Sequence, residues 1–216
     1  MSPRAEPDPV RLYLVRHAQA RADDGSYGPD TPLSPLGRRQ AEAVAVALAH
    51  AGLAAIYASP MRRARETAEP LSRVTGLEVQ VDERLSEFEI ADWDPDDEDH
   101  EYDWAWRPEH TGTPGGETIG AFAKRVAAAC EDIVPPHPGE SVAIVSHSGT
   151  GDAILRWAMA LPPDSPWFHE FDLPNGAVVE ILVWPEGRHR DGPPRYTAIR
   201  RAPNLDHLPD SLRTPY

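Results

Sequence analysis

Two histidines in this sequence closely follow short apolar runs. Arg16 and His17 come directly after the run at residues 12–15, and His147 follows the run at residues 142–145 after a single serine. Apolar runs of this length that end in polar residues are typical of buried strands. In open α/β sheets, ligands bind beyond the carboxyl ends of the strands. We therefore expect both histidines at one edge of one sheet, although an arginine and a histidine at a strand end can also be ordinary solvated residues.

Further cationic and small residues are expected at the same edge. Arg62, Arg63 and Arg65 lie in the first turns of a predicted helix that opens with a serine-proline pair. Another predicted helix begins with the small residues 148–151, and its N-terminal amides would point at anything bound between the histidines. A phosphoryl group is the natural ligand of two arginines, two histidines and a helix N-terminus. Each feature alone could be structural, but the three together favour a phosphate site.

The elements that must position these residues alternate between strand and helix. Apolar runs predict strands that include residues 12–15, 54–58, 78–81, 141–146, 175–184 and 196–199. Helical spacing predicts helices over residues 35–51, 60–76, 117–134 and 149–160, the first two preceded by the capping residues Ser34 and Ser59. This alternation predicts a three-layer α/β/α sandwich with a mainly parallel central sheet.

The chain is expected to form one domain at residues 10–202, between a disordered lead (1–9) and a C-terminal tail (203–216) that is wrapped or loose. An insertion at about residues 84–116 is expected to cover one end of the sheet as a lid. The insertion is very acidic between residues 92 and 99, but it lacks the spaced glycine and terminal glutamate of an EF-hand, so no metal is expected there. Its tryptophans anchor a long loop or, alternatively, serve a protein partner; they are Trp93, Trp104 and Trp106.

Composition narrows the class of protein. The 216 residues are 40% hydrophobic and 26% charged, which suits one α/β domain. A net charge of −14 argues against nucleic acid or an anionic membrane as partner. The single cysteine, Cys130, allows no intrachain disulfide and is interpreted as core packing. Because no apolar run approaches a membrane span and residues 1–9 lack a secretory apolar region, a cytoplasmic location is expected. The oligomeric state stays open, a homodimer included.

Six segments resemble, in family order, those of the histidine phosphatase superfamily, the phosphoglycerate mutase-like group. The segments are LVRHAQA, DTPLSPLGRRQA, ASPMRRARETA, RLSEFEIADW, PGGET and IVSHSG. The matches run from about Leu12 to Asn175 and cover most of the chain. The resemblance implies the phosphoglycerate mutase-like fold with a lid insertion, and phosphoryl chemistry at the two histidines.

The resemblance also implies a role for each residue of the expected phosphate site. His17 is similar to the nucleophile that attacks phosphorus in line and forms a phosphohistidine. Arg16, Arg63 and His147 resemble the groups that bind the non-bridging oxygens, over which the transition state spreads its charge. An imidazole attacks only when it is neutral, and the charges of both arginines disfavour its protonation. Since arginines neutralise the phosphate, no metal or other cofactor is expected.

A carboxyl group and several substrate contacts are implied by the same resemblance. Glu87 resembles the proton donor to the leaving oxygen, which then acts as the base that activates water. Its neighbour Glu89 is a rival that fits the spacing less well. Gln19, Ser148 and Arg107 are expected to contact the substrate.

Four departures from the family pattern leave the chemistry open to alternatives. Ala18 and Ser148 replace glycines beside the two histidines, Ala91 replaces another glycine, and Asp94-Pro95 stands where Glu-Gly is usual. The charged residues of the phosphate site remain, so a catalytically silent protein is disfavoured.

Three functions remain to be distinguished. The first is a metal-independent phosphatase of the histidine acid phosphatase type that hydrolyses a small phosphorylated metabolite. A phosphomutase would have to hold a second phosphate, and the lid offers it only Arg107 and His110 among many acids. The third function is a regulatory or binding module that keeps the fold without turnover. The lid selects the substrate, and the sequence does not name it.

Overall fold

Six strands form one sheet in the part of the chain that the structure describes. The computed structural model describes residues 8–22, 24–25, 27–89, 107–167, 171–187 and 195–214. The strand order is β3-β2-β4-β1-β5-β6, with β1 Val10–Arg16, β2 Leu53–Ala58, β3 Val79–Val81, β4 Ser141–Ser146, β5 Val178–Trp184 and β6 Tyr196–Asn204. The four strands from β3 to β1 are parallel, whereas β5 and β6 pair antiparallel. The prediction of a mainly parallel sheet is confirmed.

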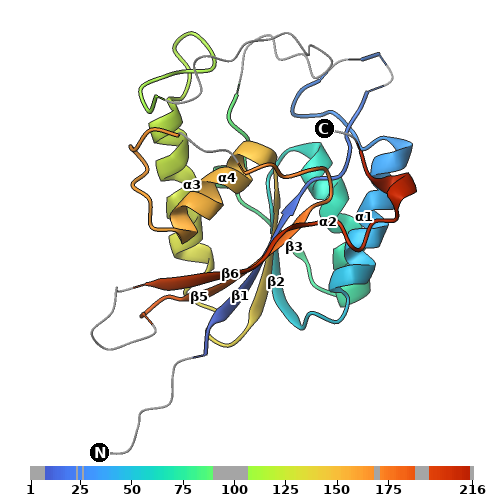
Figure 1. Cartoon of the computed structure of the whole chain (residues 1–216). Coiled ribbons are helices and arrows are strands. Elements are labelled where there is room, and N and C mark those ends of the chain that lie inside the picture. The colour runs from blue at the N-terminus through green and yellow to red at the C-terminus, as the bar shows by residue number, and fades with distance from the viewer. Residues whose placement is uncertain are drawn as a thin grey trace, which may run out of the picture.

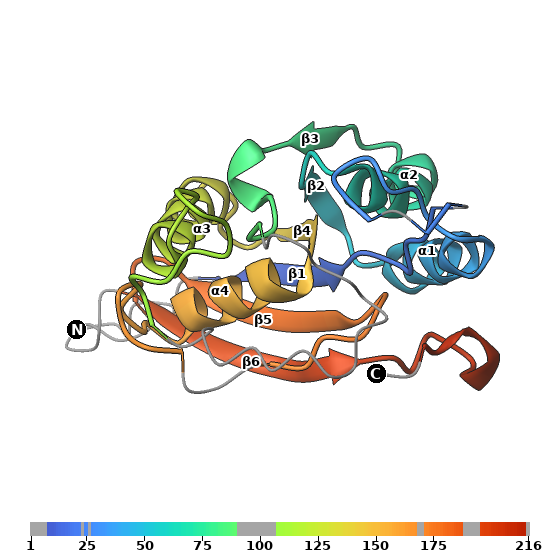
Figure 2. The ribbon, with the colours of Figure 1, turned by 90° about the horizontal axis from the view of Figure 1, so that it is seen from above.

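Helices cover both faces of this sheet, two on each side (Figure 2). Helices α1 and α2 lie on one face and α3 and α4 on the other; their bounds are Pro35–Leu48, Arg62–Thr75, Ile119–Ile133 and Ser148–Ala158. Each pair packs its apolar side chains into a separate core against the sheet, and β4 is buried along its whole length between them. Cys130 lies inside the α3 core, as predicted, and burial raises the pKa of its thiol. The predicted three-layer sandwich is confirmed.

Side-chain caps determine where α1 and α3 begin. The Ser34 hydroxyl accepts a hydrogen bond from the Gly37 amide at 3.0 Å, so α1 starts as predicted. It ends at Leu48, three residues before the predicted end. Helix α3 begins two residues later than predicted, because the Thr118 hydroxyl caps it by accepting from the Ala121 amide at 3.1 Å.

The start of α2 differs from the prediction in a way that concerns the site. Met61 is the N-cap residue, without a side-chain capping bond, so the prediction that Ser59 caps this helix is wrong. The Ser59 side chain is fully buried, and its Oγ lies 2.7 Å from Nε2 of His147. The serine therefore connects the end of β2 to the end of β4.

The sheet register brings three strand ends together. Arg16 at the end of β1 is paired with Ser146 at the end of β4, and Ala58 at the end of β2 is paired with Val145. The ladder continues one residue further, since the His17 amide donates to the Ser146 carbonyl at 2.7 Å. The histidines that follow β1 and β4 consequently lie at one edge of the sheet, as the sequence predicts.

The chain after β6 returns to helix α1 (Figure 1). Strand β6 extends to Asn204, beyond the predicted strand end at residue 199, and Leu208 and Leu212 are buried after it. The Gln40 side chain, on α1, donates to the Leu212 carbonyl at 2.7 Å. The end of the described chain is therefore wrapped against the domain.

Parts of several predictions lie outside the described residues. These are most of the predicted lead, the acidic run with its three tryptophans, and the substituted positions Ala91, Asp94 and Pro95. Among the helices that the structure describes, none has the length and apolar character needed to cross a membrane.

Candidate active site

The ring of His17 is oriented by one contact on each nitrogen. Its Nδ1 lies 2.8 Å from the Ala18 carbonyl oxygen, and its Nε2 lies 3.2 Å from Nε of Arg63. A carbonyl can only accept, so Nδ1 carries the proton and donates it. The guanidinium can only donate, which leaves Nε2 unprotonated with its lone pair directed toward Arg63. The nitrogen with a lone pair is therefore beside a positive charge.

Burial and charge together keep the His17 imidazole neutral. The side chain is 3% exposed, and burial lowers its pKa well below the ordinary value, with further lowering by Arg63 and then Arg16. The sequence argument named the two arginines, but the largest cause is burial, which no local pattern reveals. A neutral imidazole is what nucleophilic attack requires.

Arg63 is fixed on several sides. In addition to His17, it donates through Nη1 to the Gly28 carbonyl at 2.9 Å and through Nη2 to the Met61 sulfur at 3.1 Å. Its guanidinium lies over the Tyr27 ring, 4.9 Å from the centroid. A buried guanidinium with this many partners keeps one orientation, so its charge is presented from a fixed place.

Thr67 couples Arg63 to the segment after β1. Its hydroxyl donates to the Arg63 carbonyl at 2.7 Å and accepts from the Ala18 amide at 3.0 Å. Ala18 itself is buried against Leu33 and Ala41, so the methyl group that replaces the family glycine is accommodated by packing.

Gln19 is held by α1. Its amide donates to Oε1 of Gln40 at 2.8 Å, and its side-chain oxygen accepts from the Ser34 hydroxyl at 2.6 Å. A Cβ on Gly37 would lie 2.0 Å from the Gln19 carbonyl oxygen, so this approach requires glycine. The predicted substrate contact of Gln19 thus belongs to a side chain already bonded within the protein.

His147 faces His17 across the strand ends. The two rings are 5.1 Å apart between centroids, and burial, followed by His17 and Arg63, lowers the His147 pKa well below its ordinary value. Its Nδ1 and the Nε of Arg16 are buried and have no hydrogen-bond partner in the described part of the chain. Buried polar atoms normally have partners. Two nitrogens of the expected phosphate site therefore retain unused hydrogen-bonding capacity.

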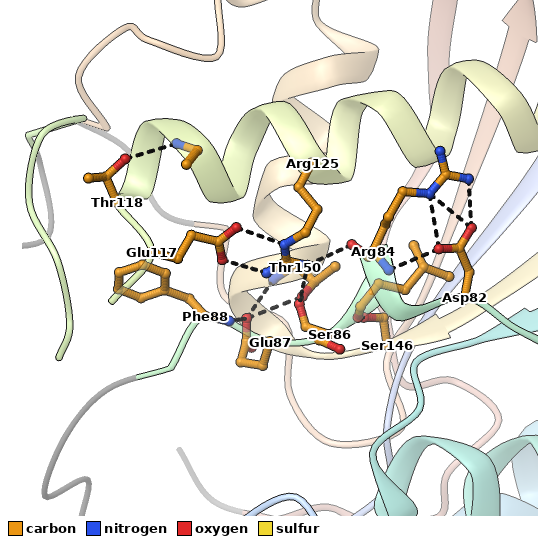
Figure 3. A network of polar contacts seen from close by, with 12 residues as sticks. Asp82, Arg84, Ser86, Glu87, Phe88, Glu117, Thr118, Arg125, Ser146 and Thr150 are labelled. Carbon is orange, nitrogen blue, oxygen red and sulfur yellow. Dashed lines mark hydrogen bonds and ion pairs between the residues drawn. The ribbon is translucent and has the colours of Figure 1, made fainter. Parts of the chain in front are cut away.

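The carboxylate of Glu87 occupies the N-terminus of α4 (Figure 3). Its Oε2 accepts from the Gly149 amide at 2.9 Å, and its Oε1 accepts from the Thr150 amide at 2.9 Å and the Thr150 hydroxyl at 3.2 Å. The Phe88 amide also donates to Oε1 at 2.9 Å. The expectation that the first amides of this helix face a bound anion is therefore wrong for two of them, because a carboxylate of the protein is already there.

The remaining predicted residues differ in placement. Glu89, the rival of Glu87, is exposed. Ser148 is half-buried as the first residue of α4, directly after His147. Arg107 is exposed where the described chain resumes after residue 89. The structure thus brings Arg16, His17, Arg63, Glu87 and His147 together but leaves Arg107 at the surface.

Sequence reasoning assigned no site contact to several residues that build this arrangement. They share a buried or half-buried polar side chain that bonds to the backbone or the side chain of a site residue: Gln40, Ser59, Thr67 and Asn175, the last of which donates to the His17 carbonyl at 3.2 Å. Gln40, Ser59 and Thr67 stand in the segments that resemble the family, and their position in those segments is the only signal that could have indicated them.

The two buried neutral histidines predict that the fold is weakened by acid. The unfolded chain takes up protons near the ordinary histidine pKa of 6.5, whereas folded His17 and His147 do so only at much lower pH. The free energy of unfolding should therefore fall as pH drops below that value, by about 2 kcal/mol between about pH 7.5 and pH 5.5 for the pair. Urea unfolding at the two pH values measures this loss.

The matched comparison is the His17→Asn variant, which removes one of the two groups. Its loss of unfolding free energy between the two pH values should be about half as large. An equal loss in the variant and the parent protein would show that carboxylates, not these histidines, cause the acid sensitivity.

Comparison with known proteins identifies the family. The model of the histidine phosphatase superfamily (branch 1) matches residues 12–191, and the chain belongs to this superfamily. Glucosyl-3-phosphoglycerate phosphatase of Mycobacterium tuberculosis is 34% identical over 170 residues, which cover 70% of this chain and 76% of the relative. Phosphoserine phosphatase 1 of Hydrogenobacter thermophilus is 30% identical over 155 residues, covering 64% and 71%.

A solved structure agrees with the fold. The mycobacterial glucosyl-3-phosphoglycerate phosphatase in complex with VO3 superposes with a TM-score of 0.70 at 28% identity, over 88% of this chain and 97% of that chain. The relatives named here are phosphatases, so the predicted family and its general class of chemistry are confirmed.

Proposed function

We propose that this protein is a metal-independent phosphatase that hydrolyses a small phosphomonoester through a phosphohistidine on His17. The observation that carries the proposal is the state of the His17 ring, neutral and with Nε2 unprotonated beside Arg63. Nε2 attacks phosphorus as the bond from phosphorus to the ester oxygen breaks. Water then attacks the phosphohistidine, which releases inorganic phosphate and restores the imidazole.

Arg16, Arg63 and His147 bind the non-bridging oxygens in this proposal. Arg16 and His147 each have a buried nitrogen without a protein partner, which supports a ligand contact. Because Ser59 Oγ accepts from the Met61 amide at 3.3 Å, its own proton is free to be donated to Nε2 of His147. That assignment gives Nδ1 of His147 the proton and makes it a donor for the phosphoryl group.

Glu87 transfers the protons. Its Oε1 accepts three hydrogen bonds and its Oε2 accepts only one in the described part of the chain, so Oε2 is the oxygen with room for a proton. It gives that proton to the leaving ester oxygen in the first step and takes one from the attacking water in the second. Its electrostatic interaction with Arg16 supports a location within the same site.

The substrate is proposed to be a small phosphorylated metabolite. The relatives are named for phosphoserine and glucosyl-3-phosphoglycerate, and the mycobacterial enzyme has been solved with VO3 and with inorganic phosphate. We infer hydrolysis rather than phosphate relocation, since the relatives are phosphatases and the lid is rich in acids. The lid at residues 84–116, including Arg107, and Ser148 beside His147 are proposed to contact the part of the substrate beyond the phosphate.

The test is turnover of nitrophenyl phosphate with a chelator present, followed by a metabolite panel. The proposal expects phosphate release without added metal, and a radioactive phosphate label on His17 that survives alkali and is lost in acid. A requirement for a bisphosphorylated primer would indicate a mutase instead. Tight phosphate binding with no turnover on any phosphomonoester would favour the regulatory module.

A further inference from the structure

One guanidinium holds the backbone that leads to Glu87. Arg125, on α3, donates through Nη1 to the carbonyl oxygens of Arg84 at 2.7 Å and Ser86 at 3.0 Å (Figure 3). Its other edge is bidentate to Glu117, with Nε to Oε1 at 2.8 Å and Nη2 to Oε2 at 2.7 Å. The guanidinium therefore bridges a carboxylate and the two carbonyls that precede the proposed acid.

Two hydroxyl groups complete the attachment of the same segment. The Ser146 hydroxyl, at the end of β4, donates to the Leu85 carbonyl at 2.7 Å, and the Thr150 hydroxyl donates to the Ser86 carbonyl at 3.1 Å. Three consecutive carbonyls are thus bound, and Arg125 supplies the only charged donor among these contacts in the described part of the chain. The backbone of Glu87 is held from α3 while its carboxylate is held from α4.

These contacts need the shape of a guanidinium. A planar group with five donors can bond to a carboxylate along one edge and to two carbonyls with the remaining nitrogen. A lysine ammonium presents three donors from one point and cannot span both groups. A carboxyl group that moves protons has to be held within about 0.5 Å of its working place, so the orientation of this arginine controls a catalytic distance.

We propose that Arg125, oriented by Glu117, is a positioning residue for the Glu87 carboxyl. The inference rests on the proposed function, in which Glu87 protonates the leaving oxygen. Arg125 acts through the Arg84 and Ser86 carbonyls and contacts no reacting atom. It also explains chemically why Glu117 stands in the PGGET segment, eight residues before its arginine on the same side of α3.

The test compares leaving groups in Arg125→Met. A dinitrophenyl phosphate releases an oxygen that needs no proton, whereas an alkyl phosphate releases one that does. The proposal expects kcat on the alkyl substrate to fall about 10- to 100-fold with KM little changed, and kcat on the dinitrophenyl substrate to fall less than about threefold. Arg125→Lys should recover only part of the loss, and Glu117→Gln should lose activity with the same leaving-group dependence.

Arg195→Met is the matched control. Arg195 is exposed to a similar extent, forms an ion pair with Glu131 of α3 and donates to the Trp157 carbonyl at 2.8 Å, without contacts near Glu87. Its removal should affect both substrates alike. An equal loss on both substrates in Arg125→Met would overturn the proposal and leave a merely structural role.

A double-mutant cycle separates this inference from the proposed function. If Arg125 acts through Glu87, then Arg125→Met should cause no further loss on the alkyl substrate in a Glu87→Gln background. Additive losses would overturn the positioning role even if the parent enzyme turns over as proposed. A parent protein that hydrolyses neither substrate would instead remove the proposed function, and this inference with it. Should Arg125→Met fail to fold, Arg125→Lys and Glu117→Gln give the same comparison.

Discussion

Replacing His17 with alanine is expected to lower kcat/KM by about 10⁵- to 10⁶-fold, the largest effect of any single substitution in this chain. The substitution removes the unprotonated Nε2 that lies 3.2 Å from Arg63, and the described residues around it offer no second nucleophile in the same place. His147 is the nearest imidazole, but its Nε2 is bonded to Ser59. The measurement is steady-state hydrolysis of a nitrophenyl phosphate together with trapping of the labelled intermediate.

The control is His137→Ala, which removes a half-buried histidine bonded to Glu140 at 2.8 Å and remote from the site residues. Its activity and its labelling should match those of the parent protein. The mechanism proposed here would be wrong if His17→Ala still formed the labelled intermediate, because the phosphoryl group would then reside on another residue.

Much of the fold is readable from local patterns. Apolar runs ending in Arg16-His17 and Ser146-His147 mark the carboxyl ends of two strands, and parallel pairing then forces those ends to one edge. The alternation of strands and helices predicts the three layers for the same reason. Ser34 caps α1 as expected, because an N-cap depends only on residues within one turn.

The details of the site depend on contacts between residues far apart in the sequence. Ser59 meets His147, and Thr67 meets Ala18, only after the strands have paired. The resemblance to the family indicated Glu87, but its binding to the first amides of α4 could not be derived from spacing. The pKa of His17 is a further case, since burial is a property of the assembled core.

The second large effect is expected from Arg63→Met, with a loss of about 10³-fold in kcat/KM. The side chain provides one of the two guanidinium charges proposed to bind the phosphoryl oxygens, and it donates to His17 Nε2. Its charge also lowers the pKa of His17, so its removal should raise that pKa. His17 would then become protonated at higher pH, and the acid limb of the kcat/KM profile should move toward neutral pH.

The neighbouring arginine separates these effects from a general loss of charge. Arg62→Met removes the same charge from the same helical turn, but Arg62 is about half exposed and is paired with Glu66 at 2.6 Å. It should retain nearly full activity and an unmoved acid limb. If Arg63→Met lost activity while its acid limb stayed in place, Arg63 would bind the phosphoryl group without controlling the protonation of His17. The two roles that its contacts combine would then belong to different residues, with burial alone keeping the nucleophile neutral.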